Sequence, residues 1–210
     1  MRRLLLVCLV VAHVGAAHAG AYDDILAGAE NNRIETVVSL LQLGLDPNTA
    51  TRDGTTLLMT AARNGNLAMV DALLKHRANH LIRNKFGDTA LMLATLNGRL
   101  DVVKRLADLG GAQENRDGWA PLHYAAFGGN VAVARYLLDK GASVNMRAPN
   151  SQTALMLAAG AGHLEMVKFL IDAEGDMKLE DRQGKTAQQI AEARGHQAIV
   201  EYMALFDGPH

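Results

Sequence analysis

Apolar side chains recur along the chain at intervals of three and four residues, within short segments that polar residues and glycines separate. One such segment carries Leu67, Val70, Leu73 and Leu74. This spacing places the apolar side chains on one face of an α-helix. A helix with one apolar face must bury that face against a neighbouring element, so the pattern predicts short helices stacked on one another. The equivalent stripes further along are Leu100, Val103 and Leu106; Val131, Ala134, Leu137 and Leu138; and Leu164, Val167, Leu170 and Ile171.

Two series of small residues divide the chain into copies of nearly equal length. The first series falls at successive intervals of 33, 31, 33 and 33 residues, and the second keeps the same step. A period near 33 residues is typical of a stacked repeat architecture. The first series is Gly54, Gly87, Gly118, Ser151 and Gly184, and the second is Asn32, Gly65, Gly98, Gly129, Gly162 and Gly195.

Each copy contains local signals for the ends of its first helix. Thr56, Thr89, Thr153 and Thr186 precede apolar segments, where a threonine hydroxyl accepts a hydrogen bond from a free backbone N–H. The fourth copy has Ala120 at this position, so it lacks the cap, at a cost of about 1 kcal/mol. The glycines of the second series suit the left-handed turn that ends the first helix.

Three segments resemble the ankyrin repeat. Residues 117–126 (DGWAPLHYAA) nearly match the family's D-G-x-T-P-L-H-x-A-A, residues 162–170 (GHLEMVKFL) resemble its second helix, and residues 140–145 (KGASVN) resemble the segment before the next hairpin. The resemblance extends over residues 21–206. It implies an all-α ankyrin-repeat solenoid of about six helix-turn-helix units with short hairpin loops, and protein binding on a concave surface formed by hairpin tips and first helices.

The repeat phase predicts the boundaries of the copies. In the last copy, Gln188 and Gln189 replace apolar residues, which is typical of a terminal repeat that keeps the end of a stack soluble. The predicted units are an N-terminal capping repeat at 20–52, repeats at 53–85, 86–116 (with a shortened loop), 117–149 and 150–182, and a C-terminal capping repeat and tail at 183–210.

Residues 1–19 are predicted to be a signal peptide. Arg2 and Arg3 precede an apolar run at 4–14, and residues 17–19 (AHA) form a cleavage motif of small residues. An uncleaved anchor is the weaker alternative, because a spanning helix needs roughly 20 apolar residues; a buried N-terminal helix is another. We expect an exported bacterial protein in the periplasm, with secretion as the alternative. The only cysteine, Cys8, would leave with the signal peptide.

Charge argues against nucleic acid as a partner. The chain has 21 basic and 22 acidic residues, and removal of Arg2 and Arg3 leaves 21 − 2 = 19 basic residues, hence a net charge of −3. Nucleic-acid binding requires a markedly basic surface. We expect a monomer that binds a protein, with no membrane insertion once the signal peptide is cleaved.

The sequence contains no motif for catalysis, cofactor binding or a metal site. His123 lies in a position that Met59, Met92 and Met156 occupy in other copies, so the repeat does not need an imidazole there. His163 and His196 occupy equivalent positions in adjacent copies, which lie too far apart to share one zinc ion, since neighbouring helix axes are about 8–10 Å apart. The sequence therefore predicts a protein that is not an enzyme and has no cofactor.

Large apolar side chains gather at the predicted concave positions of the two central copies, while outer copies present polar or small residues such as Gln152, Gly160 and Arg194. A central aromatic group with a polar rim is typical of an interface hot spot. Alternatively, Trp119 and Phe127 pack against a neighbouring hairpin. A secreted host-directed or scaffolding role is the other function that remains open. The predicted partner-binding residues are Trp119, Phe86, Phe127 and Leu96, flanked by Arg52, Arg63, Lys85 and Arg116, which favour an acidic partner.

Overall fold

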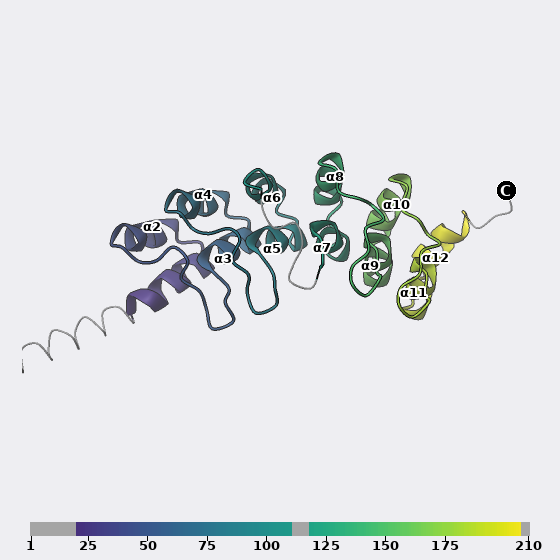
Figure 1. The fold of residues 1–210 in the computed structure, drawn as a ribbon, viewed down its shortest axis with the longest axis horizontal. Helices are drawn as coiled ribbons and strands as arrows, with labels where there is room; N and C mark the ends of the chain where they lie inside the picture. Colours follow the sequence, from purple (N-terminus) through teal and green to yellow (C-terminus); the bar gives the residue numbers. More distant parts are fainter. Residues whose placement is uncertain (1–19, 111–117, 207–210) are drawn as a thin grey trace, which may run out of the picture.

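The computed structural model describes residues 20–110 and 118–206, in which short helices follow one another in pairs (Figure 1). Residues 20–30 form the first helix. In the described ranges there is no strand, only one isolated antiparallel bridge between Ala50 and Thr56. The all-α solenoid is thus confirmed. The further helices are α2 (Ile34–Gln42), α3 (Leu57–Asn64), α4 (Leu67–Lys75), α5 (Ala90–Leu96), α6 (Leu100–Ala107), α7 (Pro121–Phe127), α8 (Val131–Asp139), α9 (Ala154–Ala161), α10 (Leu164–Asp172), α11 (Ala187–Ala193) and α12 (Gln197–Ala204).

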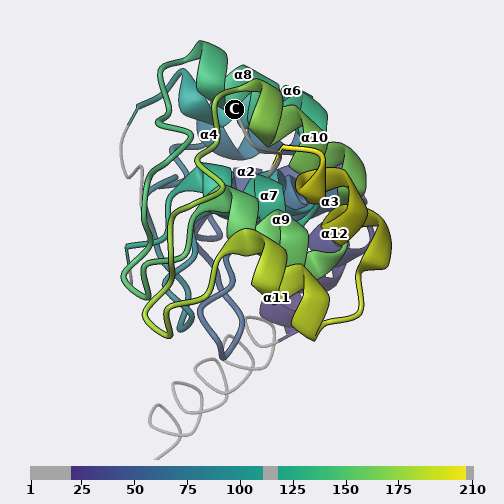
Figure 2. The ribbon, with the colours of Figure 1, turned by 90° about the vertical axis from the view of Figure 1, so that its right-hand side faces the viewer.

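The helices form two rows along the stack. Helices α3, α5, α7, α9 and α11 pack against one another in sequence and form the first row. Helices α4, α6, α8, α10 and α12 each pack on their own first helix and form the second row, which covers one side of the first (Figures 1 and 2). The loops that join successive pairs project away from the second row (Figure 2). One face of the first row therefore stays uncovered beside these hairpins.

Most first-row helices begin with a reciprocal pair of hydrogen bonds. Thr56 Oγ1 accepts a hydrogen bond from the Met59 backbone N–H at 3.2 Å, and Met59 Sδ accepts one from the Thr56 N–H at 3.4 Å. The threonine caps predicted at four helices are confirmed. The other pairs are Thr89 with Met92, Thr153 with Met156, and Thr186 with Gln189.

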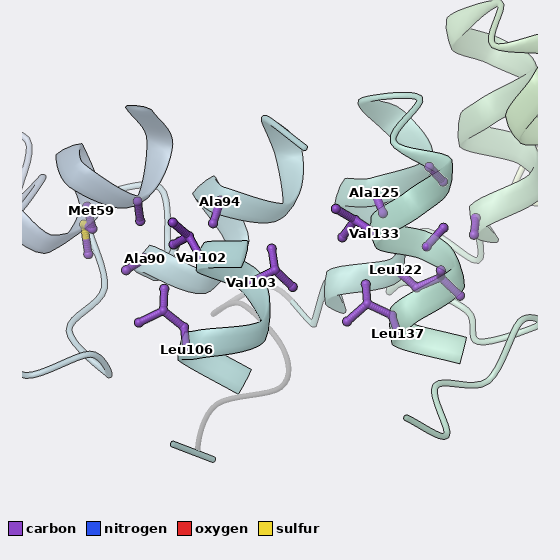
Figure 3. Packing of buried hydrophobic residues seen from close by; sticks show 14 of the residues in the cluster. Met59, Ala90, Ala94, Val102, Val103, Leu106, Leu122, Ala125, Val133 and Leu137 are labelled. Atoms are coloured by element: carbon purple, nitrogen blue, oxygen red, sulfur yellow. The ribbon is translucent and has the colours of Figure 1, made fainter. Parts of the chain in front are cut away.

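Buried aliphatic side chains fill the space between the two rows as one continuous cluster. Figure 3 shows Val103 and Leu106 of α6, and Val133 and Leu137 of α8, within this cluster. Alanines line the contact between first-row helices, because a small side chain lets two helices approach closely; they include Ala61 and Ala62, Ala125 and Ala126, and Ala158 and Ala159.

A ladder of side-chain hydrogen bonds connects each of the third to sixth repeats to the one before it. In these four cases, the residue after the glycine that follows a first-row helix donates to a main-chain carbonyl oxygen of the preceding repeat, near the end of its first-row helix. These ladder residues are Arg99 (to Arg63 O, 3.1 Å), Asn130 (to Leu96 O, 2.8 Å), His163 (to Phe127 O, 2.9 Å) and His196 (to Gly160 O, 3.1 Å). In the second repeat, the equivalent Asn66 instead donates to the side-chain oxygen of Asn32 at 3.4 Å.

The ladder limits the space at the glycine of the repeat before it. Gly129 has φ +69°, the predicted left-handed turn, and a Cβ added there would lie 2.9 Å from the ring of His163. Both the backbone conformation and the lack of space disfavour a side chain at this position. The imidazoles of His163 and His196 each bind the backbone of a different repeat, so the structure assigns them to stacking.

Candidate partner-binding groove

The uncovered face of the first row contains a groove of about 380 Å³ that extends over α7, α9 and α11. Tyr124 from α7, Leu157 from α9 and Ile190 from α11 line it. These three side chains occupy equivalent positions, exactly one 33-residue period apart. Successive repeats therefore place them side by side along the groove.

At one position of the groove lining, α9 contributes a glycine where α7 contributes Phe127. Gly160 lies one period after Phe127, and both residues line the groove. A Cβ added at Gly160 would lie 3.0 Å from Ile190 Cγ2 and 3.4 Å from Arg194 Nη1. Glycine at this position therefore allows α11 to approach α9 closely.

Arg194 lies at the α11 end of the groove. Its Nη1 donates a hydrogen bond to the Gly160 carbonyl oxygen at 2.8 Å, and its side chain is exposed. This bond fixes the guanidinium against α9 and engages one of the five N–H donors of the planar head. An arginine held in this way is suited to binding a carboxylate with two hydrogen bonds.

Trp119 and Phe127 lie at the opposite end, beside Tyr124. The Trp119 and His123 rings meet edge to face, with centroids 5.6 Å apart and planes at 76°. The hydroxyl of Tyr124 donates to the carboxylate of Asp88, which belongs to the hairpin of the preceding repeat. Trp119 is half-buried, whereas Phe127 is 53% exposed. This end of the groove is therefore aromatic, partly open and anchored to the scaffold.

His123 is a buried residue of α7 that connects the start of this helix to the next hairpin. Its ring is 1% exposed, Nδ1 accepts from the Ala120 N–H at 3.0 Å, and Nε2 donates to the Met146 carbonyl oxygen at 3.0 Å. Because the N–H can only donate and the carbonyl can only accept, these partners fix a neutral ring with its proton on Nε2. Both ring nitrogens are engaged and the ring is buried, so this imidazole acts as scaffold.

The structure brings only some of the predicted binding residues together. Trp119 and Phe127 both line the groove. Phe86 is 66% exposed and, like Leu96 at the end of α5, lies outside the groove lining. Arg63 forms an ion pair with Glu30 at 2.7 Å. Arg52 and Lys85 are exposed on hairpins, and Arg116 lies outside the described residues.

Tyr124, Leu157 and Ile190 were not among the predicted binding residues. Each occurs within an apolar first-helix segment, where the sequence pattern indicates core packing. Their exact 33-residue spacing was the available signal, since equivalent positions in stacked repeats line one surface. What the spacing does not reveal is that these three helices form a groove on that surface.

The hairpin tips present basic side chains whose acidic neighbours are already hydrogen-bonded. The Asp53 carboxylate accepts hydrogen bonds from the hydroxyls of Thr51 and Thr55, which lower the pKa of Asp53 below its ordinary value. The Asp181 carboxylate accepts from two backbone N–H groups of its own hairpin. In the part of the chain that the structure describes, none of the exposed basic tip residues forms a salt bridge; these residues are Arg52, Lys85, Arg182 and Lys185.

A second cavity, of about 510 Å³, lies between the third and fourth repeats. Ala120, Leu91 and Tyr136 line it, and its only charged lining residues are Asp108 and Lys140.

The described residues contain neither a cluster of metal ligands nor a helix that could span a membrane. Over residues 20–110 and 118–206, no three histidine, cysteine, aspartate or glutamate side chains come together as metal ligands. The helices in these ranges are all too short or too polar to span a bilayer. The absence of catalysis and of a cofactor stays a prediction.

Comparison with known proteins supports the family resemblance. A family model described as "Ankyrin repeats (3 copies)" matches residues 25–115, 77–148 and 144–209. Two curated relatives are the ankyrin repeat and SAM domain-containing protein 6 of Rattus norvegicus and that of Mus musculus, each 31% identical over 110 residues. The alignment covers 52% of this chain but 9% of each relative, so it concerns a small part of those proteins. The helix pairs, the hairpins and the family match together show that the chain belongs to the ankyrin-repeat family.

Proposed function

We propose that this protein is a non-catalytic binding module that holds a protein partner in the groove over α7, α9 and α11. One observation carries the proposal: Trp119, Tyr124 and Phe127 gather at the end of a hollow on the face that the second row leaves uncovered. Ankyrin repeats are generally protein-interaction modules. Phe127 is one of the large apolar side chains that stay exposed in the described residues, and a partner in the groove would bury it.

The energetic argument favours the aromatic end as the anchor. Phe127 exposes about half of its side chain, and burial of apolar surface contributes roughly 25 cal/mol per Å². Trp119 and Tyr124 are already held by contacts to the scaffold, so they would lose little side-chain entropy on binding. Aromatic residues with these properties dominate many protein interfaces.

Hydrogen bonding of the polar groups near the groove supports a non-catalytic role. Both nitrogens of His123 are engaged with the backbone, and the carboxylate of Asp88 accepts the hydroxyl of Tyr124. General acid–base catalysis needs a side chain that can reach a substrate proton. Neither group is placed to do so.

A site-specific cross-link tests the binding face. Cys8, in the proposed signal peptide, is the chain's only cysteine, so Gln152→Cys, at a polar residue of the groove lining, in a chain that starts at Gly20 gives a unique attachment point for a photo-cross-linker. We expect a cross-linked protein partner from the exported fraction, and a large loss of it when Trp119→Ala is added. Lys104→Cys, exposed on α6 of the second row, is the matched control. Equal cross-linking at both positions, or no effect of Trp119→Ala, would contradict this site.

We further propose that the protein is exported by a bacterium, stays in the periplasm and is a monomer. The arginines, the apolar run and the small-residue motif of residues 1–19 support export. Expression of the full chain in a bacterial host should yield a periplasmic protein whose N-terminal residue is Gly20 by mass spectrometry. Recovery from the culture medium would favour the secreted, host-directed alternative. Sedimentation at the mass of two chains would contradict the monomer.

A further inference from the structure

We propose that the groove selects an extended segment of a partner protein that combines one bulky apolar side chain with a carboxylate a few residues away. The apolar side chain occupies the hollow beside Tyr124, Phe127 and Leu157, and the carboxylate pairs with Arg194. This inference rests on the proposed function and adds to it the chemistry of the partner.

The apolar half of the recognition follows from the shape of the groove. Tyr124, Phe127 and Leu157 all line the groove, whose volume is about 380 Å³. A leucine or aromatic side chain of the partner would fit into this volume. Filling it would bury the exposed part of Phe127.

The charged half follows from Arg194. Its guanidinium donates a hydrogen bond to the Gly160 carbonyl oxygen at 2.8 Å. Among the described residues, its side chain forms no other hydrogen bond. A guanidinium carries five N–H donors in a planar head, so several remain available for a carboxylate. A pre-positioned arginine loses less entropy than a mobile lysine when it binds.

The surrounding charges favour an acidic partner. Lys185 and Arg182 are exposed on the hairpin that leads into α11. Asp181 on the same hairpin accepts backbone hydrogen bonds, and Asp88 at the far end of the groove accepts from Tyr124. Glu192 lies within α11, whereas Arg194 follows the last residue of that helix, and Glu192 is not among the residues that line the groove.

The distances suit an extended chain. Neighbouring helix axes are about 8–10 Å apart, so the span from α7 to α11 is about 16–20 Å. An extended chain covers about 3.3 Å per residue, so five or six residues cross the groove. An apolar side chain between α7 and α9 then lies roughly one helix spacing from Arg194. This places the acidic residue about two to four positions from the apolar one.

A peptide-display selection tests this recognition directly. Random heptapeptides are selected on the chain that starts at Gly20, and enriched sequences are synthesised with a fluorophore for anisotropy titration. We expect a consensus with an aspartate or glutamate two to four positions from a leucine or aromatic residue. Arg194→Gln should weaken binding of such a peptide by about 10- to 100-fold, because a hydrogen-bonded charge contributes about 1.5–3 kcal/mol.

A charge reversal separates recognition from stability. Selection on Arg194→Glu should change the preferred residue from acidic to basic at the same spacing, which a loss of packing alone would not do. Lys104→Glu on the second row is the matched control and should leave the consensus unchanged. Circular dichroism of each variant checks that the helices are retained.

Different failures would overturn different claims. A consensus without acidic residues, unchanged by Arg194→Glu but lost with Phe127→Ala, would overturn the acidic partner and leave protein binding in place. Peptides that bind only as helices would overturn the extended segment. No enrichment over the Phe127→Ala variant, or a groove occupied by a second copy as shown by a dimeric mass, would overturn both the inference and the proposed function.

Discussion

The second and fourth repeats have the same helix pair but differ at the start of the first-row helix. In the second repeat, Thr56 and Met59 cap α3 through hydrogen bonds between neighbours in sequence. In the fourth repeat, Ala120 has no hydroxyl, and His123 both accepts from the Ala120 N–H and donates to Met146 O, 23 residues away. The fourth repeat thus replaces part of a local cap with a bond to the next hairpin.

The same two repeats also differ on the uncovered face. Arg63 in the second repeat forms an ion pair with Glu30 of the first repeat, whereas Phe127 at the equivalent position in the fourth is half exposed. The second repeat pairs this surface side chain with another residue of the chain, whereas the fourth repeat leaves an apolar side chain exposed to solvent. Equivalent positions therefore serve internal stability in one copy and, in our proposal, binding in another.

The largest expected effect is at His123. His123→Ala would leave the Ala120 N–H and the Met146 carbonyl oxygen without their partner and would open a cavity, so it should lower the free energy of unfolding by about 2–4 kcal/mol. Chemical denaturation followed by circular dichroism measures this. His123→Met, which copies the second repeat, should restore part of the loss. If His123→Met and His123→Ala have the same free energy of unfolding, a methionine cannot stabilise the start of α7 as Met59 stabilises the start of α3.

A smaller effect is expected at the glycines of the ladder. An alanine at Gly129 would adopt positive φ and meet the His163 ring at 2.9 Å, with an expected cost of about 2 kcal/mol. At Gly65 the added Cβ would meet Arg99 Cδ at 2.7 Å, in a flexible side chain that can move, so the cost should be lower. Gly195, with φ +76° and open space around it, is the control for the backbone alone. Equal costs at Gly129 and Gly195 would exclude crowding by the ring.

Restoring the missing cap should stabilise the fourth repeat. Ala120→Thr would supply the hydroxyl that Thr56 supplies to α3, for a gain of about 1 kcal/mol, and the cavity beside Ala120 provides space for it. Thr56→Ala should cost a similar amount. Thermal and chemical unfolding of both variants measures these two changes in the free energy of unfolding. A destabilised Ala120→Thr would show that His123 holds the backbone where a threonine cannot cap it.

The smallest expected effect is at Arg63. The Arg63 and Glu30 side chains are 40% and 60% exposed, and exposed pairs contribute at most about 1 kcal/mol, so Arg63→Ala should cost less than that. A double-mutant cycle with Glu30→Ala measures the coupling, which should diminish at high salt. A coupling well above 1 kcal/mol would show that this pair matters more to the second repeat than its exposure implies.

Much of the fold could be predicted from the sequence, because the signals that define it are local. The threonine of each cap and the glycine of each turn lie within ten residues of each other, so each copy specifies its own first helix. The hydrogen bonds of the ladder give a reason for the period: the donor in each of the third to sixth repeats must reach a carbonyl about one repeat earlier.

The groove could be predicted only in part, because it depends on residues from three repeats. Trp119 and Phe127 were identified as exceptional within their own copy. The bond from Arg194 to the Gly160 carbonyl oxygen connects positions 34 residues apart, and no feature of either copy alone indicates it. Arg63 illustrates the same difficulty, since its partner Glu30 is 33 residues away.

The acceptor of every ladder bond is a main-chain carbonyl, and this affects how such a chain can grow. A peptide oxygen is the same whatever residue carries it, which is why arginine, asparagine and histidine all serve as donors here. A duplicated unit would bring its own donor to the preceding unit and offer its own acceptor to the next one. The ladder therefore lets the gene gain or lose whole units without compensating substitutions at the new junction.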